Sequence, residues 1–288
     1  MPSYTPVKLA FSVVVPKNGV SEKPPIIFAH GLSGSKEHWE DFTQLFADRT
    51  KRKVYAIDAR NHGDSEWNDV FNFDCNVDDF LHFMDSEKIS KAIIVGHSMG
   101  GITGIKMALI APERVEKLIV EDMSVSPPPA EVIGMVVSVL SMLKNALQVL
   151  PKGVDEATAI QMLFSIVLSQ IPEEVKSNFV KPESFQKLKI AFKRLEDGSL
   201  TFKANLDILL KFIKEAKDVQ EAVEGVYEGP AFFLYGKLSP FHAHLDEPSV
   251  KKHFPKADIT SIENATHTVH FDQPEEFAEA VLNFILKE

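Results

Sequence analysis

The stretch VGHSMGGITG, residues 95–104, places one serine between glycines directly after a run of aliphatic residues. A serine on so tight a strand-to-helix turn has a strained backbone, and the residues two before and two after it must be small. Gly96 and Gly100 occupy those positions. The pattern predicts that Ser98 is a nucleophile raised above a sheet, although a serine that only caps a helix could stand in the same five residues.

Short aliphatic runs recur along the chain, and turn residues bound each of them. They are nearly continuous in apolar character, which is typical of strands buried on both faces of a parallel sheet. Amphipathic segments of helical period lie between them, so we predict an α/β fold: an open, mostly parallel sheet with helices on both faces. An earlier strand that ends at an Asn-Gly turn should form an antiparallel edge. The runs are residues 25–31, 53–60, 91–98, 117–123 and 231–236, and the edge strand is residues 7–15.

The alternation of strands and helices breaks between residues 125 and 229. This segment has the pattern of four or five amphipathic helices with no buried strand, punctuated by Pro151, Pro172 and Pro182. An insertion of that length between two strands of one sheet is most simply a helical cap over the sheet. We therefore expect a core made of residues 1–124 and 230–288, with residues 125–229 as the cap.

A serine nucleophile needs a general base, and ligands of a parallel sheet bind at the carboxyl ends of its strands. His267 follows a predicted last strand and precedes the C-terminal helix, so it can reach that edge. His270 lies three residues later and is a weaker candidate. We predict that His267 is the base.

The acid that would orient this histidine is less certain from the residues. Ser239 stands where an aspartate would be expected, a few residues after AFFLYG. Asp122 ends the strand next to the serine-bearing strand and could accept a hydrogen bond from the His267 ring. Asp207, in a predicted cap helix, would need the cap to fold onto the histidine. Glu121 should point to the opposite face.

The oxyanion of an acyl-transfer reaction needs two backbone N–H groups. Met99, directly after the nucleophile, supplies one of them. The loop AHGLSGS, residues 29–35, supplies the other, and Leu32 is its natural donor. His30 in the same loop is more simply a buried residue that orients the loop than a catalytic group.

Composition argues against several classes of function. The formal net charge of −10 gives no basic field for nucleic acid or for an anionic membrane. Cys75 is the only cysteine, which rules out an intrachain disulfide or a thiolate metal cluster. The longest apolar segment, residues 132–143, is too short and too interrupted by serine to span a bilayer. The N-terminal residues have no signal-like pattern, so we expect an intracellular protein, cytoplasmic most simply, or mitochondrial if the chain is a processed form.

Five motifs, in the same order along the chain, resemble the α/β-hydrolase superfamily, and within it the group that contains abhydrolase domain-containing protein 11 and related small esterases. The likeness covers nearly all of the chain outside the cap. The motifs are HGLSGS (30–35), AIDARNHGDS (56–65), VGHSMGG (95–101), APERVEKLIVEDMS (111–124) and NATHTVHFDQP (264–274).

The resemblance implies a hydrolase of esters or thioesters, lipid-like ones included, that needs no metal or organic cofactor. It assigns Ser98 as nucleophile and His267 as base, whereas Asp122 and Asp207 both fall where members have an aspartate. The chain departs from the family around the histidine: a threonine replaces the usual glycine before it and another replaces the usual tryptophan after it. These changes at Thr266 and Thr268 alter the expected pocket wall and hence the substrate preference.

The predicted function is therefore a serine hydrolase that cleaves carboxylic esters through an acyl-enzyme on Ser98. One alternative is a ligand-binding or regulatory protein on the same fold with little turnover. A C–C bond hydrolase or a cofactor-free haloperoxidase would use the same three residues. Haloalkane dehalogenases and epoxide hydrolases of this fold carry an aspartate at the position of Ser98, which argues against both.

Overall fold

Seven strands form one sheet in the order β1-β3-β2-β4-β5-β8-β9 in the computed structural model, which describes residues 4–170, 189–215 and 223–287. Every neighbouring pair in this sheet is parallel except β1 with β3, which is antiparallel. The predicted parallel sheet with an antiparallel edge is confirmed. The strands are β1 (Phe11–Val14), β2 (Ile26–Ala29), β3 (Val54–Ile57), β4 (Ala92–His97), β5 (Val115–Glu121), β8 (Ala231–Gly236) and β9 (Ala257–Ile262).

The central strands are apolar throughout because both faces of the sheet are covered. Every residue of β2, β3, β4 and β8 is buried. In the register of the sheet, Ala29 pairs with Gly96 and His97 pairs with Glu121. The carboxyl ends of β2, β4 and β5 therefore lie level with one another, and the loops that follow them share one edge.

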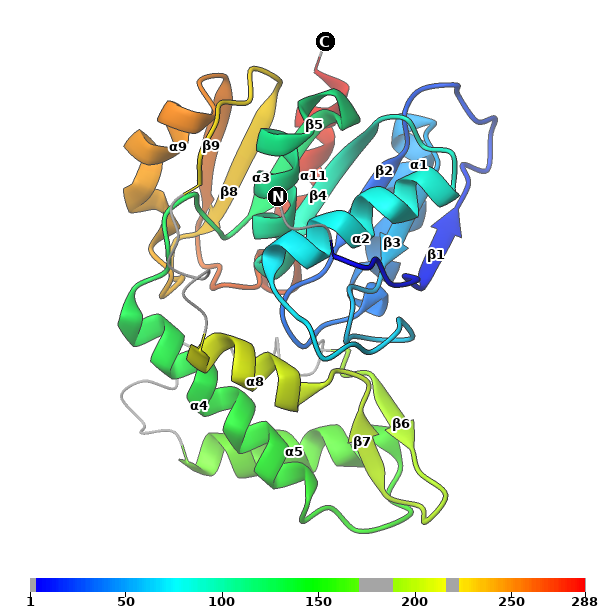
Figure 1. Cartoon of the computed structure of the whole chain (residues 1–288), viewed down its shortest axis with the longest axis vertical. Helices are drawn as coiled ribbons and strands as arrows, with labels where there is room; N and C mark the ends of the chain where they lie inside the picture. Colours follow the sequence, from blue (N-terminus) through cyan, green and yellow to red (C-terminus); the bar gives the residue numbers. More distant parts are fainter. Residues whose placement is uncertain (1–3, 171–188, 216–222, 288) are drawn as a thin grey trace.

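Helices cover both faces of this sheet (Figure 1). Phe80 of α2, Ile105 of α3 and Val250 of α9 belong to one hydrophobic cluster, and Phe46 of α1 and Phe277 of α11 belong to the other. The predicted apolar stripe of the last helix is buried. The helices of this part are α1 (Glu40–Thr50), α2 (Phe73–Ser86), α3 (Met99–Ile110), α9 (Glu247–His253), α10 (Val269–Asp272) and α11 (Pro274–Leu286), with 3-10 turns η1 (Lys36–Trp39), η2 (Pro112–Arg114) and η4 (Ala243–Asp246).

Between β5 and β8 the described residues form a separate group of elements below the sheet in Figure 1, which we call the α4–α8 layer. It contains α4 (Ala130–Leu147), α5 (Glu156–Gln170), β6 (Phe192–Arg194), β7 (Leu200–Phe202) and α8 (Leu206–Glu215). Residues 171–188 and 216–222, which include the predicted breaks at Pro172 and Pro182, lie outside the described residues. The boundaries of the predicted cap stay a prediction.

This segment also contains two short, partly buried strands that the sequence pattern did not indicate. β6 and β7 pair as an antiparallel hairpin, in which Phe192 faces Phe202. The turn contains Asp197 and Gly198, and Gly198 has a φ of 82°, a conformation that favours glycine. Strands of three residues are too short to produce a period-2 pattern, so only the Asp-Gly turn signalled the hairpin.

The α4–α8 layer is fastened to the sheet part by polar contacts as well as by apolar packing. Lys203, directly after β7, forms an ion pair with Asp64 at 2.5 Å. The backbone N–H of Asn205 donates to the carbonyl of Asn61 at 2.8 Å. Both partners follow β3, so the start of α8 is fixed over the loop that leaves the sheet there.

Helix α4 has 18 residues and a mean hydropathy of 1.5, and 17% of it is buried. Among the described residues it is the one helix that is long and apolar enough to cross a membrane by length and composition. It is longer than the apolar segment 132–143 because its ends include Glu131 and Lys144. A single helix of this kind is consistent with a chain that has no stable membrane span, and α4 here packs against α5 and α8.

Candidate active site

Ser98 lies at the junction of β4 and α3 with a φ of 50°, in the left-handed region that non-glycine residues rarely adopt. The two flanking glycines are required by close backbone contacts. A Cβ on Gly96 would lie 2.3 Å from the carbonyl oxygen of Gly100, and one on Gly100 would lie 2.3 Å from the carbonyl oxygen of Ala29. The turn therefore has the strained geometry that the sequence pattern predicts, and α3 begins directly after the serine.

His267 and Asp122 are joined by a hydrogen bond, with Nδ1 of the imidazole donating to Oδ2 of the carboxylate at 2.6 Å. Asp122 follows the last residue of β5, is fully buried and has a φ of 51°. Its other oxygen, Oδ1, accepts the backbone N–H of Gly236 at 2.9 Å, and the hydroxyl of Ser239 also donates to Oδ2. The carboxylate is thus held from three sides, which fixes the tautomer of His267 with Nε2 free to accept a proton.

Asp207 is far more exposed than the other candidate acid. It lies in the first turn of α8, its side chain is 73% exposed, and it forms an ion pair with Lys144 of α4. The structure therefore brings Asp122 to His267, whereas Asp207 links two helices of the α4–α8 layer.

The loop after β2 is ordered by buried histidines. Nδ1 of His30 donates to the carbonyl of Gly31 at 2.7 Å, and its Nε2 accepts the N–H of Ala59 at 3.1 Å. Burial lowers the pKa of His30 to about 4, so the ring is neutral at pH 7. His30 orients the loop, as expected from the sequence. Leu32 of this loop and Met99 of α3 line the same cavity as Ser98.

Asp58 and His62, after β3, support the same loop, and sequence reasoning gave them no role. The Asp58 carboxylate accepts the backbone N–H and the ammonium of Lys36 at 2.7 and 2.8 Å. The N–H of Ser33 donates to Nε2 of His62 at 3.2 Å. Gly63 has a φ of 55°, and a Cβ there would lie 2.1 Å from the Asp58 carboxyl carbon. The quoted motif DARNHGDS was the only signal that these residues work together.

A cavity of about 320 Å³ lies between the carboxyl edge of the sheet and the α4–α8 layer. Ser98, Met99, Leu32 and His267 lie at its sheet side. Apolar side chains form most of the remaining wall. They include Val132, Ile133, Met135, Val136, Val139, Leu140 and Leu143 of α4, Phe164 and Val167 of α5, Phe212 and Ile213 of α8, and Phe73, Ile102, Phe241 and Phe271 from elsewhere.

Two aromatic rings shape the cavity beside His267. Phe241 stacks face to face on His267, with ring centroids 3.9 Å apart and an interplanar angle of 12°. His38 also lines the cavity, and its Nε2 donates to the carbonyl of Lys189 at 3.0 Å. Burial lowers the pKa of His38 to about 3, so this histidine is neutral as well.

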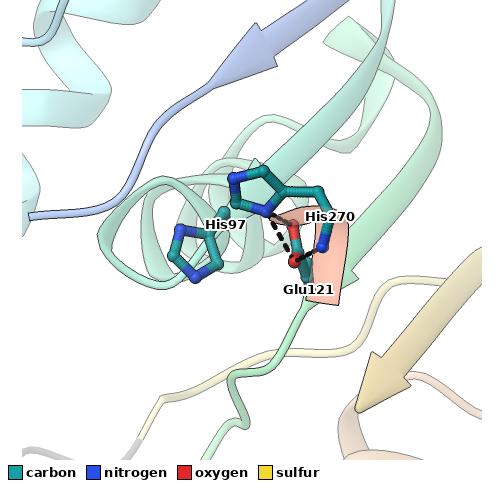
Figure 2. Close-up of side chains that lie close together, drawn as sticks. All are labelled: His97, Glu121 and His270. Carbon is teal, nitrogen blue, oxygen red and sulfur yellow. Dashed lines mark hydrogen bonds and ion pairs between the residues drawn. The ribbon is translucent and has the colours of Figure 1, made fainter. Parts of the chain in front are cut away.

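Glu121 lies on the same face of β5 as Ile119 and opposite Val120, as the alternation of a strand predicts, and on that face it binds His270. Its Oε1 accepts the backbone N–H of His270 at 2.9 Å, and its two oxygens lie 2.7 and 2.9 Å from Nδ1 of the same ring (Figure 2). The strand ends at Asp122, which has a left-handed conformation, and the two neighbouring carboxylates contact different residues of the loop that carries His267. His270 is therefore paired with Glu121, and His267 is the histidine that lies at the cavity with Ser98.

His97, Glu121 and His270 are the group of described residues that could hold a metal ion, since one ligand atom from each lies within 4.8 Å of the others. Their hydrogen bonds argue against that use. Nδ1 of His270 is engaged by Glu121, and Nε2 of His97 donates to the carbonyl of His267 at 2.9 Å. Among the described residues, Nδ1 of His97 and Nε2 of His270 have no hydrogen-bond partner. A metal bound through Nε2 of His97 or Nδ1 of His270 would have to break the bonds that hold the loop of His267.

Comparisons with known proteins agree with this arrangement. A family model described as "Alpha/beta hydrolase family" matches residues 26–280. The sn-1-specific diacylglycerol lipase ABHD11 of Danio rerio is 30% identical over 99% of this chain and 84% of that protein. Ethanol acetyltransferase 1 of Cyberlindnera fabianii is 27% identical over 99% of this chain and 88% of that protein. A solved structure described as a marine microorganism esterase has a TM-score of 0.77 and 27% identity, over 96% of this chain and 99% of that one. The chain belongs to the alpha/beta hydrolase family, and it is a carboxylic ester hydrolase.

Proposed function

We propose that this chain hydrolyses carboxylic esters in two steps through an acyl-enzyme on Ser98, with His267 as general base and Asp122 as the acid that orients it. The observation that carries the proposal is the 2.6 Å hydrogen bond from His267 to the buried Asp122, at a cavity that Ser98 also lines. A neutral imidazole held in this tautomer presents Nε2 as a proton acceptor, which is what a serine nucleophile requires.

In the first step, Oγ of Ser98 attacks the ester carbonyl carbon while its proton passes to Nε2 of His267. The carbonyl oxygen becomes an oxyanion, and the backbone N–H groups of Leu32 and Met99 donate to it. Met99 is the first residue of α3, where backbone N–H groups have no acceptor within the helix and the helix dipole favours negative charge. Collapse of this intermediate breaks the bond to the alcohol oxygen, which takes the proton from His267.

In the second step, a water molecule gives a proton to His267 as its oxygen attacks the acyl carbon. The same two N–H groups hold the second oxyanion. The bond to Oγ then breaks, and Ser98 regains the proton from His267. The products are a carboxylic acid and an alcohol, and the enzyme returns to its starting state.

An ester with an apolar, lipid-like acyl chain is the proposed substrate class. Side chains of α4, α5 and α8 form an apolar wall, and the cavity volume of about 320 Å³ is within the usual size of small-molecule sites. The carbonyl would lie at Ser98, and the chain would extend between the sheet edge and α4. A thioester with the same acyl group would fit the same contacts.

Labelling with a fluorophosphonate probe tests this function directly. The parent protein should be labelled at Ser98 and should hydrolyse p-nitrophenyl acyl esters, and Ser98→Ala should lose both properties. Ser138→Ala is a matched control, because its hydroxyl lies on α4 and donates to the carbonyl of Gly134. Hydrolysis by Ser98→Ala at the parent rate would contradict the proposal, and absence of any Ser98 adduct would favour a ligand-binding protein on this fold.

A further inference from the structure

The loop that carries His267 is held by more contacts than the bond to Asp122. We call residues 266–270 the base loop. Its first residue is anchored locally, because the N–H and the hydroxyl of Thr266 both donate to Oδ2 of Asp272 at 2.6 Å. Its last residue is anchored to the sheet by the Glu121 contacts with the backbone and ring of His270. Both ends of the base loop are therefore fixed around the catalytic imidazole.

The middle of the base loop has its own anchor in β4. Nε2 of His97 donates to the carbonyl oxygen of His267 at 2.9 Å. Burial, together with repulsion from the neighbouring His267 and His270, holds the pKa of His97 well below its usual range, so this ring is neutral. A neutral ring that donates from Nε2 has one fixed tautomer, which gives the contact a defined direction.

The two anchors come from residues that are neighbours across the sheet. His97 ends β4, Glu121 ends β5, and the two residues are paired in the register of these strands. Ser98 and Asp122 follow them directly in the sequence. The same pair of strand ends thus carries the nucleophile, the acid and two side chains that bind the backbone of the base loop.

We propose that Glu121 and His97 are positioning residues for catalysis: they fix the backbone of the base loop so that the His267 ring keeps its place between Asp122 and Ser98. The inference rests on the proposed function, since it needs His267 to act as the base. The bond to Asp122 alone fixes the His267 ring at one atom, and the loop could still rotate about that atom. The Glu121 and His97 contacts remove this freedom, and misplacement of a catalytic group by about 1 Å can lower a rate by about 100-fold.

The test compares Glu121→Gln with Glu116→Gln, a matched substitution on the same strand. Glu116 lies at the other end of β5, and its carboxylate accepts two bonds from Arg52 at 2.8 and 2.9 Å. We expect Glu121→Gln to lower kcat by about 5- to 100-fold with KM within about twofold. The rate of Ser98 labelling by the fluorophosphonate should fall by the same factor. Glu116→Gln should leave both rates unchanged.

All rates are expressed per serine that the probe can titrate, so a lower folded fraction does not count as a lower kcat. If Glu121→Gln fails to fold, His97→Asn tests the other anchor in the same assay, with the same expected loss. Unchanged kcat per titrated serine in the folded variants would overturn the positioning role. If the parent itself is not labelled at Ser98, the proposed function fails, which separates the two outcomes.

A metal at these residues would give a different result. EDTA should leave the parent activity unchanged, because the carboxylate and both histidines already bind the base loop or each other. Loss of activity in EDTA with recovery on added Zn²⁺ would overturn the positioning role and assign the three side chains as metal ligands.

Discussion

The hydroxyl of Ser239 donates a hydrogen bond to Oδ2 of Asp122, the same oxygen that accepts Nδ1–H of His267. Ser239 is the residue that occupies the position where the sequence pattern led us to expect the acid. It follows β8, whereas Asp122 follows the neighbouring strand β5. The carboxylate therefore follows the strand next to the one where we expected it, and the serine at the expected position donates to it.

Substitution of each candidate acid by asparagine should give two variants whose kcat values differ by several orders of magnitude. Asp122→Asn should lower kcat by about 10⁴-fold, because an amide no longer holds His267 in the correct tautomer. Asp207→Asn should stay within about twofold, because its exposed side chain pairs with Lys144. Steady-state hydrolysis of a p-nitrophenyl ester measures both. A larger loss of kcat in Asp207→Asn than in Asp122→Asn would identify Asp207 of α8 as the acid.

The contact between Ser239 and Asp122 predicts that a carboxylate at position 239 can take the place of the Asp122 carboxylate. In the double variant Asp122→Asn and Ser239→Asp, a carboxylate after β8 lies within reach of the His267 ring. We expect at least about tenfold recovery of kcat over Asp122→Asn alone. Ser239→Asp by itself should be destabilised, since it buries two carboxylates against each other. No recovery in the folded double variant would show that only a carboxylate after β5 can orient the base.

Alanine substitution at a glycine of the turn around Ser98 should lower the folding stability far more than alanine substitution at a glycine of α4. Gly96→Ala should destabilise the protein by at least about 3 kcal/mol, because its Cβ would meet the Gly100 carbonyl. Gly134→Ala is the control: a Cβ there meets nothing within 4 Å, and alanine in a helix should add up to about 1 kcal/mol. Urea unfolding measures both free energies, and equal stability of the two variants would refute the steric argument.

The apolar wall of the cavity should decide which acyl chains are hydrolysed. Val136 of α4 lines the cavity, so Val136→Trp should fill part of the proposed acyl site. We expect kcat/KM for a long-chain ester to fall by about tenfold or more, with little change for an acetyl ester. Val149→Trp, at a position 68% exposed, is the control. An equal fall for all chain lengths would argue that the chain does not extend along α4.

Low pH should destabilise the fold, because buried histidines resist protonation in the folded chain. Burial lowers the pKa of His30 to about 4 and that of His62 to about 3, from 6.5. Below pH 6.5 the unfolded chain binds protons that the folded chain excludes, so stability is present above that pH and is lost as pH falls toward 4. Each group contributes up to about 1.4 kcal/mol per pH unit. Urea unfolding at pH 7.5 and 5.0 should show a smaller difference for His62→Gln than for the parent, and an equal difference would contradict the assignment.

The sequence by itself determined the sheet and the tight turn at Ser98. A strand buried on both faces must be apolar along its length, and a serine in a left-handed turn needs small neighbours, so β4 and Ser98 follow from a few adjacent residues. His267 could be placed at the carboxyl edge because it follows the last strand. These features depend on local sterics and on burial, which short stretches of sequence record.

Only the tertiary structure decided which carboxylates contact His267 and its loop. Asp122 and Asp207 are both aspartates, so residue type could not distinguish them. The choice between them depends on where the loop of His267, 145 residues after Asp122, crosses the edge of the sheet. The role of Glu121 was hidden for the same reason, because strand alternation predicts the face of its side chain but not that His270, 149 residues away, packs there. Hydrogen bonds between distant segments are set by the packing of whole elements, and no local pattern records them.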